Sequence, residues 1–183
     1  IVISAFLGLT LLAVYQNYYF VMSSVCGIME ILLTSITAGL GNSYITESKE
    51  KNYTDLKKIT FMFFWLTGMC TSCFLGIFQP FMRLWVGEKF LMGFSVVVCL
   101  CAYFYLYETT RLLNVFKNAG GIWHEDRFRP LISAIVNLAL NLISVNYIGI
   151  YGIVLSTIVA LAVIEIPWLL QNIFTVMYDI YGL

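Results

Sequence analysis

Long apolar runs separated by short polar segments dominate this chain. An α-helix needs about 20 apolar residues to cross the hydrocarbon of a bilayer. The runs that approach or exceed this length are 18–41, 59–78, 90–113, 131–147 and 150–171, and a shorter run covers 1–15. The pattern predicts five complete transmembrane spans, preceded by one truncated span that ends at a polar connection near residues 15–17.

The order of side chains within these runs indicates helices. A strand of a membrane barrel alternates apolar and polar side chains. No such alternation is present in "FSVVVCLCAYFYLY" or in "LISAIVNLALNLISV". We therefore predict an all-α fold, a polytopic transmembrane helical bundle.

Composition supports a membrane protein and narrows its partners. Of the 183 residues, 61% are hydrophobic and 11% are charged, and the mean hydropathy is +0.88. A soluble domain has about one quarter charged residues. Ten acidic side chains balance ten basic ones. This balance gives no reason to expect a nucleic-acid partner, and membrane lipids are the expected surroundings.

The first residues indicate where the sequence was cut. The chain opens on Ile1 inside an apolar run, with no basic segment before it and no small-residue cleavage site after it. A secretory signal peptide would show both features. We interpret 1–15 as the end of a cut helix, and the chain as a fragment of a longer protein.

Basic residues predict which connections face the cytoplasm, because cytoplasmic loops are enriched in Lys and Arg. One group of basic residues lies in or next to the connections after the second and fourth predicted spans: Lys49, Lys51, Lys57, Lys58, Arg111, Lys117, Arg127 and Arg129. The other connections contain only Arg83 and Lys89. We therefore place segments 49–58 and 117–129 in the cytoplasm.

Small and polar side chains predict the inward faces of the helices, because apolar contact alone does not hold helices together in lipid. Such residues recur at helical spacing along four of the complete spans. The stripes are Ser23, Gly27, Glu30, Thr34, Ala38 and Gly41; Gly68, Ser72 and Gly76; Ala134, Asn137, Asn141 and Ser144; and Gly152, Ser156 and Ala160.

Glu30 is the most informative of these residues, since it lies near the middle of a predicted span. A charge at that depth costs at least about 2.5 kcal/mol. Two interpretations have equal weight. Glu30 either lines a polar cavity as a proton- or cation-linked carboxylate, together with Asn137 and Asn141, or stays protonated and hydrogen-bonded inside the bundle.

Glu108 and Arg111 lie three residues apart near the cytoplasmic end of the fourth span. The simpler interpretation is that Arg111 extends to the membrane surface and pairs with Glu108. The alternative is a cationic patch at the mouth of a cavity, suited to an anionic headgroup. In that case Arg127 and Arg129, which precede the fifth span, would belong to the same patch.

The segment "NAGGIWHEDRFRPL" has two interpretations. The simpler one is a hydrated cytoplasmic loop, anchored at the membrane surface by Trp123 and Phe128. The other is direct contact with a substrate. In both cases Pro130 suits the first turn of the next helix, where its missing N–H has no intrahelical partner.

No pattern in the sequence predicts catalysis, a cofactor or a metal site. Cys70 and Cys73 have the spacing of a zinc half-site, but no second pair accompanies them and both lie in an apolar run. His124 is the only histidine and lies in a loop. Neither a phosphate-binding glycine loop nor a paired-carboxylate motif on an aqueous domain is present. We expect no enzyme.

Several segments, in order, resemble the second half of Wzx-type polysaccharide flippases, which belong to the multidrug/oligosaccharidyl-lipid/polysaccharide exporter superfamily. The most specific are "EDRFRPLISAIVNLALN" and "GIYGIVLSTI", and the weaker ones are "VISAFLGLTLLAVYQNYYFVMSSV", "AGLGNSYITES" and "QPFMRLWVGEKF". The resemblance covers nearly the whole chain. It implies two facing helical bundles, of which this chain would contribute the C-terminal one and a missing N-terminal bundle the other.

The resemblance also implies a function. Such proteins carry an undecaprenyl-diphosphate-linked oligosaccharide across the bacterial cytoplasmic membrane by alternating access, for capsule, exopolysaccharide or O-antigen synthesis. The lipid-linked oligosaccharide is thus the expected substrate, with Arg111, Glu108, Arg127 and Arg129 as candidate binding residues. Two alternatives stay open: a drug/cation antiporter of the same superfamily, and a membrane polymerase or ligase of polysaccharide assembly.

Overall fold

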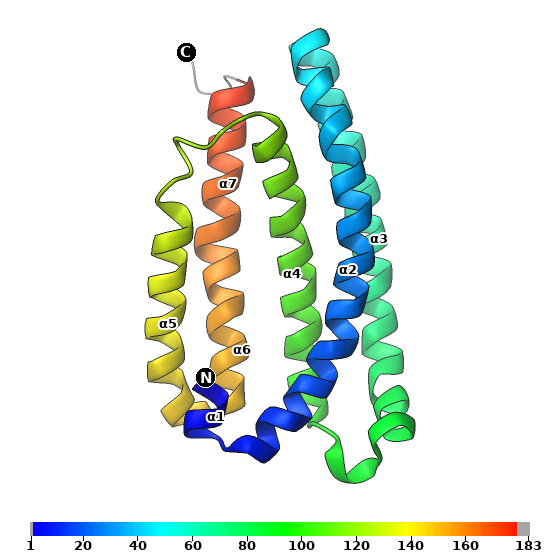
Figure 1. Cartoon of the computed structure of the whole chain (residues 1–183), viewed down its shortest axis with the longest axis vertical. Helices are drawn as coiled ribbons and strands as arrows, with labels where there is room; N and C mark the ends of the chain where they lie inside the picture. Colours follow the sequence, from blue (N-terminus) through cyan, green and yellow to red (C-terminus); the bar gives the residue numbers. More distant parts are fainter. Residues whose placement is uncertain (1, 179–183) are drawn as a thin grey trace.

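Helices form nearly all of the chain in the computed structural model, which describes residues 2–178 (Figure 1). No strand is present among these residues. Five helical segments are long and apolar enough to cross a membrane: α2 (Leu9–Thr46), α3 (Lys49–Val86), α4 (Phe94–Ala119), α5 (Arg129–Ile148) and a last segment, Ile150–Met177. The prediction of an all-α bundle with five spans is confirmed.

The last segment is continuous but changes its helical pitch. It consists of α6 (Ile150–Val159), a π-helical stretch η2 (Ala160–Glu165), α7 (Ile166–Asn172) and a second π-helical stretch η3 (Ile173–Met177). Two short elements complete the fold: α1 (Val2–Phe6) and the 3-10 turn η1 (Glu88–Phe90).

The predicted break near residues 15–17 is wrong. Tyr15, Gln16 and Asn17 lie inside α2, so residues 9–15 of the predicted truncated span are the first part of that helix. The break falls earlier, at Gly8, whose φ of 87° is a backbone conformation that side chains disfavour. Polar residues without Gly or Pro do not end a helix by themselves. Ile1, also part of that predicted span, lies outside the described residues.

Helices α2 and α3 are longer than a bilayer requires. Each has 38 residues, which corresponds to about 57 Å at 1.5 Å per residue, whereas the hydrocarbon is about 30 Å thick. Both project beyond the other helices where they join each other (Figure 1). Ser48 begins α3 there, and its side chain accepts a hydrogen bond from the Lys51 amide.

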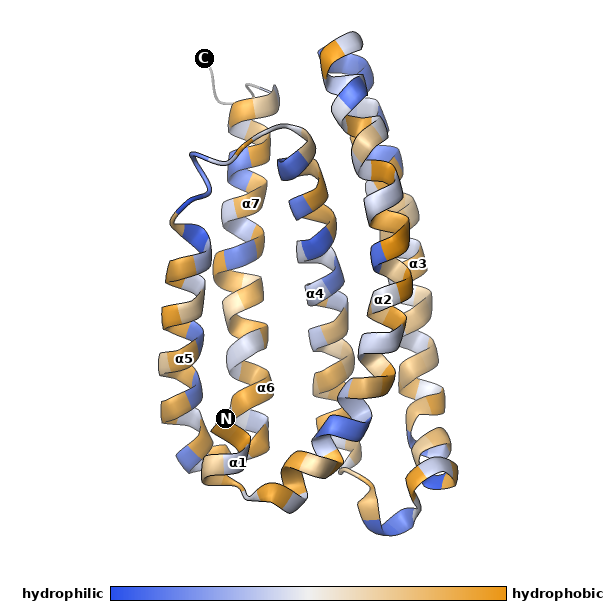
Figure 2. Ribbon diagram, in the orientation of Figure 1, coloured by the Kyte–Doolittle hydropathy of each residue, from blue (hydrophilic) through white to orange (hydrophobic). Residues whose placement is uncertain are grey.

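The two basic segments lie at the same end of the bundle. Segment 49–58 begins α3 beside the end of α2, and segment 117–129 connects α4 to α5 at that same end (Figure 1). We call this the basic end. Figure 2 shows hydrophilic residues in the upper half of α4 and in the connection that follows it. The α3–α4 and α5–α6 connections lie at the opposite end.

Helix α4 occupies the centre of the bundle. It packs against α2 and α3 on one side and against α6 and α7 on the other (Figure 1). Phe104, Leu112 and Phe116 of α4 have no exposed surface. The bulk of the hydrophobic core therefore surrounds a single helix, and that helix contains Glu108 and Arg111.

A polar contact fixes the helices near the opposite end. The Tyr18 hydroxyl of α2 donates to Gln79 Oε1 of α3 at 3.0 Å and accepts from the Met92 amide at 3.1 Å. The Gln79 side-chain amide in turn donates to the Met92 carbonyl at 2.7 Å. These bonds join α2 and α3 to the connection before α4, and the Tyr18 side chain is fully buried.

The stripe on α6 and η2 faces inward, as predicted, whereas on α5 Ala134 is exposed and Asn137, Asn141 and Ser144 are partly buried. Gly152, Ser156 and Ala160 are buried. A Cβ atom at Gly152 would lie 2.6 Å from the backbone of Ser144 on α5. Only glycine allows this approach, because real Cβ contacts are essentially never that short. The two helices thus pack through small residues.

The stripes on α2 and α3 are largely exposed, and the prediction that they pack inward against other helices is wrong for most of these residues. Ser23, Gly27 and Glu30 of α2 line an open space beside α4 instead. Gly27, Glu30 and Thr34 on α2 are exposed, as are Ser72 and Gly76 on α3. Large side chains make the contacts with α4 instead; on α2 these include Met22, Met29 and Leu33. Spacing alone identified a face of each helix but did not determine what that face contacts.

Candidate functional site

A pocket of about 260 Å³ opens between α2 and α4. Residues of α2 form one wall and residues of α4 the other: Tyr19, Met22, Ser23, Cys26, Gly27 and Glu30, facing Tyr103, Tyr107 and Arg111. We call this space the α2–α4 pocket. Its position within two membrane-spanning helices places polar and charged groups inside the membrane region.

Arg111 is the central charge of the α2–α4 pocket. Its guanidinium forms an ion pair with Glu30 of α2. It also donates to Glu108 Oε1 at 2.9 Å and to the backbone carbonyl of Cys26 at 2.9 Å. The ring of Tyr107 lies 5.5 Å from the guanidinium carbon. The bonds to Glu30 and to the Cys26 carbonyl connect α4 to α2.

The two carboxylates differ in exposure. The Glu108 side chain has no exposed surface, and its second oxygen has no hydrogen-bond partner among the described residues. The Glu30 side chain is 51% exposed. A buried charge must keep its partner, whereas an exposed one can exchange that partner for water or a ligand. Glu108 therefore holds Arg111 in place, and Glu30 is the partner that Arg111 can release.

The exposure of Glu30 also indicates what surrounds this side chain. Near the middle of a transmembrane helix, a charged side chain that faced lipid would cost at least about 2.5 kcal/mol. The exposed residues next to it, Gly27 and Thr34, are small or polar as well. This face of α2 is therefore suited to a water-filled space or another protein surface rather than to lipid chains.

A second charged cluster lies at the basic end. Asp126 accepts two hydrogen bonds from Arg129, at 2.6 and 2.8 Å, and one from Lys117 at 3.1 Å. Arg129 also donates to Asn114 at 3.0 Å and pairs with Glu165, which ends η2. The cluster joins α4, α5 and the last helical segment through four charged side chains.

The charges of this cluster are buried, which corrects the interpretation of 117–129 as a hydrated loop. Asp126 is 3% exposed and Arg129 is 5% exposed. Each charge has an opposite partner, so burial does not leave it uncompensated. The hydrated description holds for Arg127, which is exposed and contacts His124 and the ring of Phe128.

The electrostatics of Asp126 reflect this pairing. Burial raises the pKa of this carboxyl group, but the hydrogen bonds and positive charges of Arg129 and Lys117 outweigh burial and hold its pKa below the ordinary value of 3.8. Asp126 is therefore ionised at neutral pH. Its negative charge is what allows Lys117 and Arg129 to be buried.

The predicted site residues separate into distinct groups. Arg111, Glu108 and Glu30 meet in the α2–α4 pocket. Arg129 is committed to Asp126, Asn114 and Glu165 at the basic end, and Arg127 is exposed nearby. The structure does not bring these two arginines into the α2–α4 pocket.

Asn137 and Asn141 do not reach the α2–α4 pocket either. The Asn141 amide donates to Asn137 Oδ1 at 2.8 Å, and the same oxygen lies 3.5 Å from the Thr157 hydroxyl of α6. Both asparagines thus belong to the contact between α5 and α6. Their polar groups bond to each other and across a helix interface, which is the ordinary use of such residues in membranes.

Sequence reasoning missed several contributors. Asp126 was treated as one hydrated charge among others, although its spacing of three residues before Arg129 was a usable signal for a local ion pair. Lys117 and Glu165 had no such signal, because they reach Asp126 and Arg129 from other parts of the fold. Cys26 contributes its backbone carbonyl to Arg111, and no residue type predicts that role.

Five apolar spans with charged clusters inside and at one end define a multi-pass helical membrane protein. No protein-family model, curated protein or solved structure matches the chain. The class of protein therefore rests on the helices themselves, and the activity is argued from the site.

Proposed function

We propose that this chain is the C-terminal bundle of a transporter that moves lipid-linked oligosaccharides across the bacterial cytoplasmic membrane by alternating access. The half-exposed Glu30 carboxylate, paired with Arg111 inside the membrane region, is the observation that carries the proposal. The resemblance of the sequence to polysaccharide flippases supports the same function. The role would be in capsule, exopolysaccharide or O-antigen synthesis.

The contacts of Arg111 suit an anionic substrate. A diphosphate carries concentrated negative charge, and a guanidinium binds phosphate oxygens through a planar fork of donors. Glu108 and the Cys26 carbonyl orient this fork from the buried side. Glu30, on the exposed side, can be replaced by a phosphate group while remaining hydrated itself. In this proposal Arg111 exchanges Glu30 for the substrate.

The exposed stripe of α2 supports a second bundle opposite this one. Gly27, Thr34 and Ala38 lie on the same side as Glu30 and leave room beside the helix. Transporter sites commonly lie at the interface between two repeats. We propose that the N-terminal bundle of the same protein faces this stripe and that the substrate passes between the two bundles.

A drug/cation antiporter is the second candidate, and one observation favours it. The α2–α4 pocket and the buried Glu108 behind Arg111 together hold two carboxylates and one guanidinium, so with both acids ionised their net charge is negative. A negative pocket attracts a cation more readily than a diphosphate. The two candidates predict opposite effects of neutralising Glu30. Removing its charge should strengthen binding of an anion and weaken binding of a cation.

Export of lipid-linked repeat units in cells tests the proposal. Arg111→Lys keeps the charge but loses the fork, and hydrogen bonds to charged groups contribute about 1.5–3 kcal/mol. We expect export to fall by at least about tenfold at unchanged protein abundance. Arg83→Lys is the matched control, because Arg83 lies near the opposite end in an exposed ion pair with Glu88. Wild-type export in both Arg111→Lys and Arg111→Ala would contradict the proposal.

Glu30→Gln distinguishes the two candidates in the same cells. Retained or faster export of repeat units supports an anionic substrate. Loss of resistance to a lipophilic cation, with repeat-unit export unaffected by Arg111→Lys, would favour the antiporter instead.

A further inference from the structure

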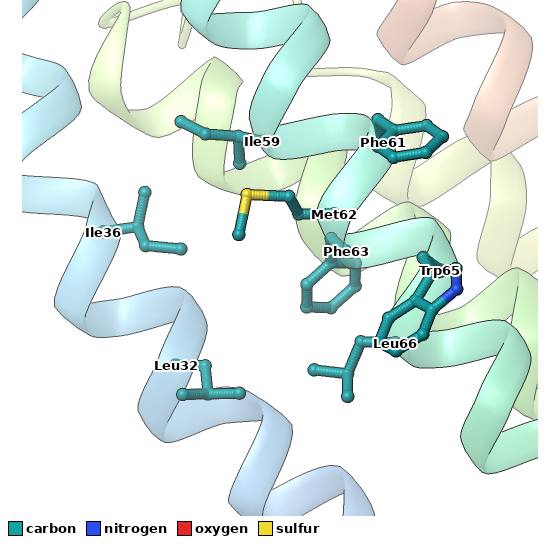
Figure 3. Close-up of a pocket in the computed structure, with 8 residues that line it drawn as sticks. All are labelled: Leu32, Ile36, Ile59, Phe61, Met62, Phe63, Trp65 and Leu66. Atoms are coloured by element: carbon teal, nitrogen blue, oxygen red, sulfur yellow. The ribbon is translucent and has the colours of Figure 1, made fainter.

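A second, entirely apolar groove lies between α2 and α3 (Figure 3). Its volume is about 370 Å³. Leu32 and Ile36 of α2 form one side, and α3 forms the rest with Ile59, Phe61, Met62, Phe63, Trp65 and Leu66. Figure 3 shows Ile36 and Met62 projecting toward each other across the space between the helices. We call this space the α2–α3 groove.

The lining argues against another helix as the occupant. Close packing of helices in membranes relies on Gly, Ala, Ser and Thr, which let two backbones approach. Every lining residue of the α2–α3 groove is large, and Phe61, Met62 and Trp65 are largely exposed, at 72%, 68% and 66%. Large side chains keep a second backbone at a distance and leave a slot suited to a flexible hydrocarbon chain.

A positive charge lies at the rim of the groove. Lys58 is exposed and precedes Met62 by four residues on α3, which places it about one helical turn nearer the basic end on the same face. It forms no ion pair with any residue from 2 to 178. Its neighbour Lys57 is exposed too, with its ammonium 4.6 Å from the centre of the Tyr53 ring.

The combination of this charge and this groove specifies a ligand. We infer that the α2–α3 groove is a binding site for an anionic phospholipid of the bilayer, whose acyl chain lies along the groove and whose phosphate contacts Lys58. The site is separate from the α2–α4 pocket, and the inference does not depend on the proposed function. It concerns a resident lipid of the leaflet at the basic end.

The headgroup, rather than the chain, would provide selectivity. Lipid tails are as apolar as the lining, so acyl chains of all phospholipids enter the groove about equally well. Attraction of an anionic lipid to a basic residue near the surface is about 1 kcal/mol, which corresponds to about fivefold enrichment. We therefore expect about a fivefold preference for phosphatidylglycerol over phosphatidylcholine, and its loss when Lys58 is replaced.

Trp65 provides a direct reporter, because it lines the groove and bromine atoms on a lipid chain quench its fluorescence on contact. The protein used carries Trp85→Phe, Trp123→Phe and Trp168→Phe, so that Trp65 is the only tryptophan. It is reconstituted with increasing fractions of dibrominated phosphatidylglycerol or dibrominated phosphatidylcholine. We expect half-maximal quenching at about a fivefold lower fraction of the anionic lipid.

Two charge-reversal variants provide the matched comparison. Lys58→Glu should make the two quenching curves coincide. Lys89→Glu, at another exposed lysine near the opposite end, should leave them apart. Coincident curves before any reversal would mean that the groove contains bulk lipid and would overturn the inference. No quenching by either lipid would mean that protein covers the groove and would overturn the inference. Recovery of Trp65 fluorescence only when undecaprenyl phosphate is added would mean that the groove binds a polyprenyl lipid, and would overturn it too.

A second measurement uses the protein with all four tryptophans. Native mass spectrometry of the detergent-solubilised chain should detect bound phosphatidylglycerol in the wild type and in Lys89→Glu. Binding should fall by about fivefold in Lys58→Glu. Equal retention of this lipid by all three proteins would overturn the inference even if the single-tryptophan protein fails to fold.

Discussion

Arg129 is buried and Arg111 is partly buried, and the two arginines differ in the exposure of their partners. Arg129 contacts Asp126, Asn114 and Glu165, and the side chains of Asp126 and Glu165 are only 3% and 12% exposed. Arg111 has one buried partner, Glu108, and one half-exposed partner, Glu30. Release of Arg129 would leave buried charges unpaired, whereas Arg111 can release Glu30 at low cost. We therefore assign a role in stabilising the fold to Arg129 and a role in exchanging ligands to Arg111.

Asp126→Asn tests the stabilising role of the cluster at the basic end. The change leaves Lys117 and Arg129 without their shared carboxylate, and breaking a buried pair costs about 3–5 kcal/mol. We expect a large fall in the thermal unfolding temperature in detergent at pH 7. Because the pKa of Asp126 is lowered by folding, its contribution is present above pH 3.8 and is lost as pH falls through the still lower pKa of the folded state.

Glu125→Gln is the control for this measurement, since Glu125 is the exposed neighbour of Asp126. Its unfolding temperature should match that of the wild type. Equal unfolding temperatures for Asp126→Asn and Glu125→Gln at pH 7 would rule out a stabilising cluster.

At the scale of helices, contacts between small residues set the closest approach. Helices α5 and α6 meet where Gly152 lies against the backbone of Ser144. On α3, by contrast, a Cβ at Gly76 would have nothing within 4 Å. Two glycines in similar sequence stripes thus have different structural roles, and the difference is measurable.

Gly152→Ala should destabilise the protein, because the added methyl group would force α5 and α6 apart. Overpacking of this kind costs about 1–3 kcal/mol. Thermal unfolding in detergent provides the measurement, with Gly76→Ala on α3 as the control. We expect a lower unfolding temperature for Gly152→Ala and an unchanged or higher one for Gly76→Ala, since alanine favours a helix over glycine. The reverse order would contradict the packing described here.

The elements that the sequence predicted well are those defined by apolar length. Five spans and the helix start around Pro130 follow from hydropathy and from the chemistry of the first helical turn. Hydropathy misplaced the break in the first apolar run, because Gln16 and Asn17 are compatible with a helix and the break is at Gly8. The exposed stripe on α2 was misassigned because a cavity face and a helix contact both select small and polar residues.

At the scale of the whole molecule, most basic residues lie at one end of the bundle. Segments 49–58 and 117–129 lie together at the basic end, and Arg83 and Lys89 lie near the opposite end. The sequence predicted that the two basic segments share a side. It did not predict the buried cluster there, because Lys117, Asp126 and Glu165 meet only once α4, α5 and the last helical segment have packed together.

Impermeant thiol labelling tests which end faces the cytoplasm. Thr54→Cys lies at an exposed position of the basic end and Lys89→Cys near the opposite end. The positive-inside rule predicts that Lys89→Cys is labelled in intact spheroplasts, while Thr54→Cys is labelled only after the membrane is opened. The unmodified protein corrects for its own five cysteines. Labelling of Thr54→Cys in intact spheroplasts would reverse the orientation.

We propose that the exposed face of α2 around Glu30 borders water, while the α2–α3 groove borders lipid. Gly27→Cys and Met62→Cys report on these two surfaces, since Gly27 lines the α2–α4 pocket with open space around it and Met62 lines the groove. The measurement is the rate of modification by a water-soluble methanethiosulfonate reagent in membranes containing the full protein. We expect Gly27→Cys to react at least about tenfold faster than Met62→Cys, because the thiolate that reacts forms only in contact with water. Equal, background-level rates at the two positions would contradict the proposal.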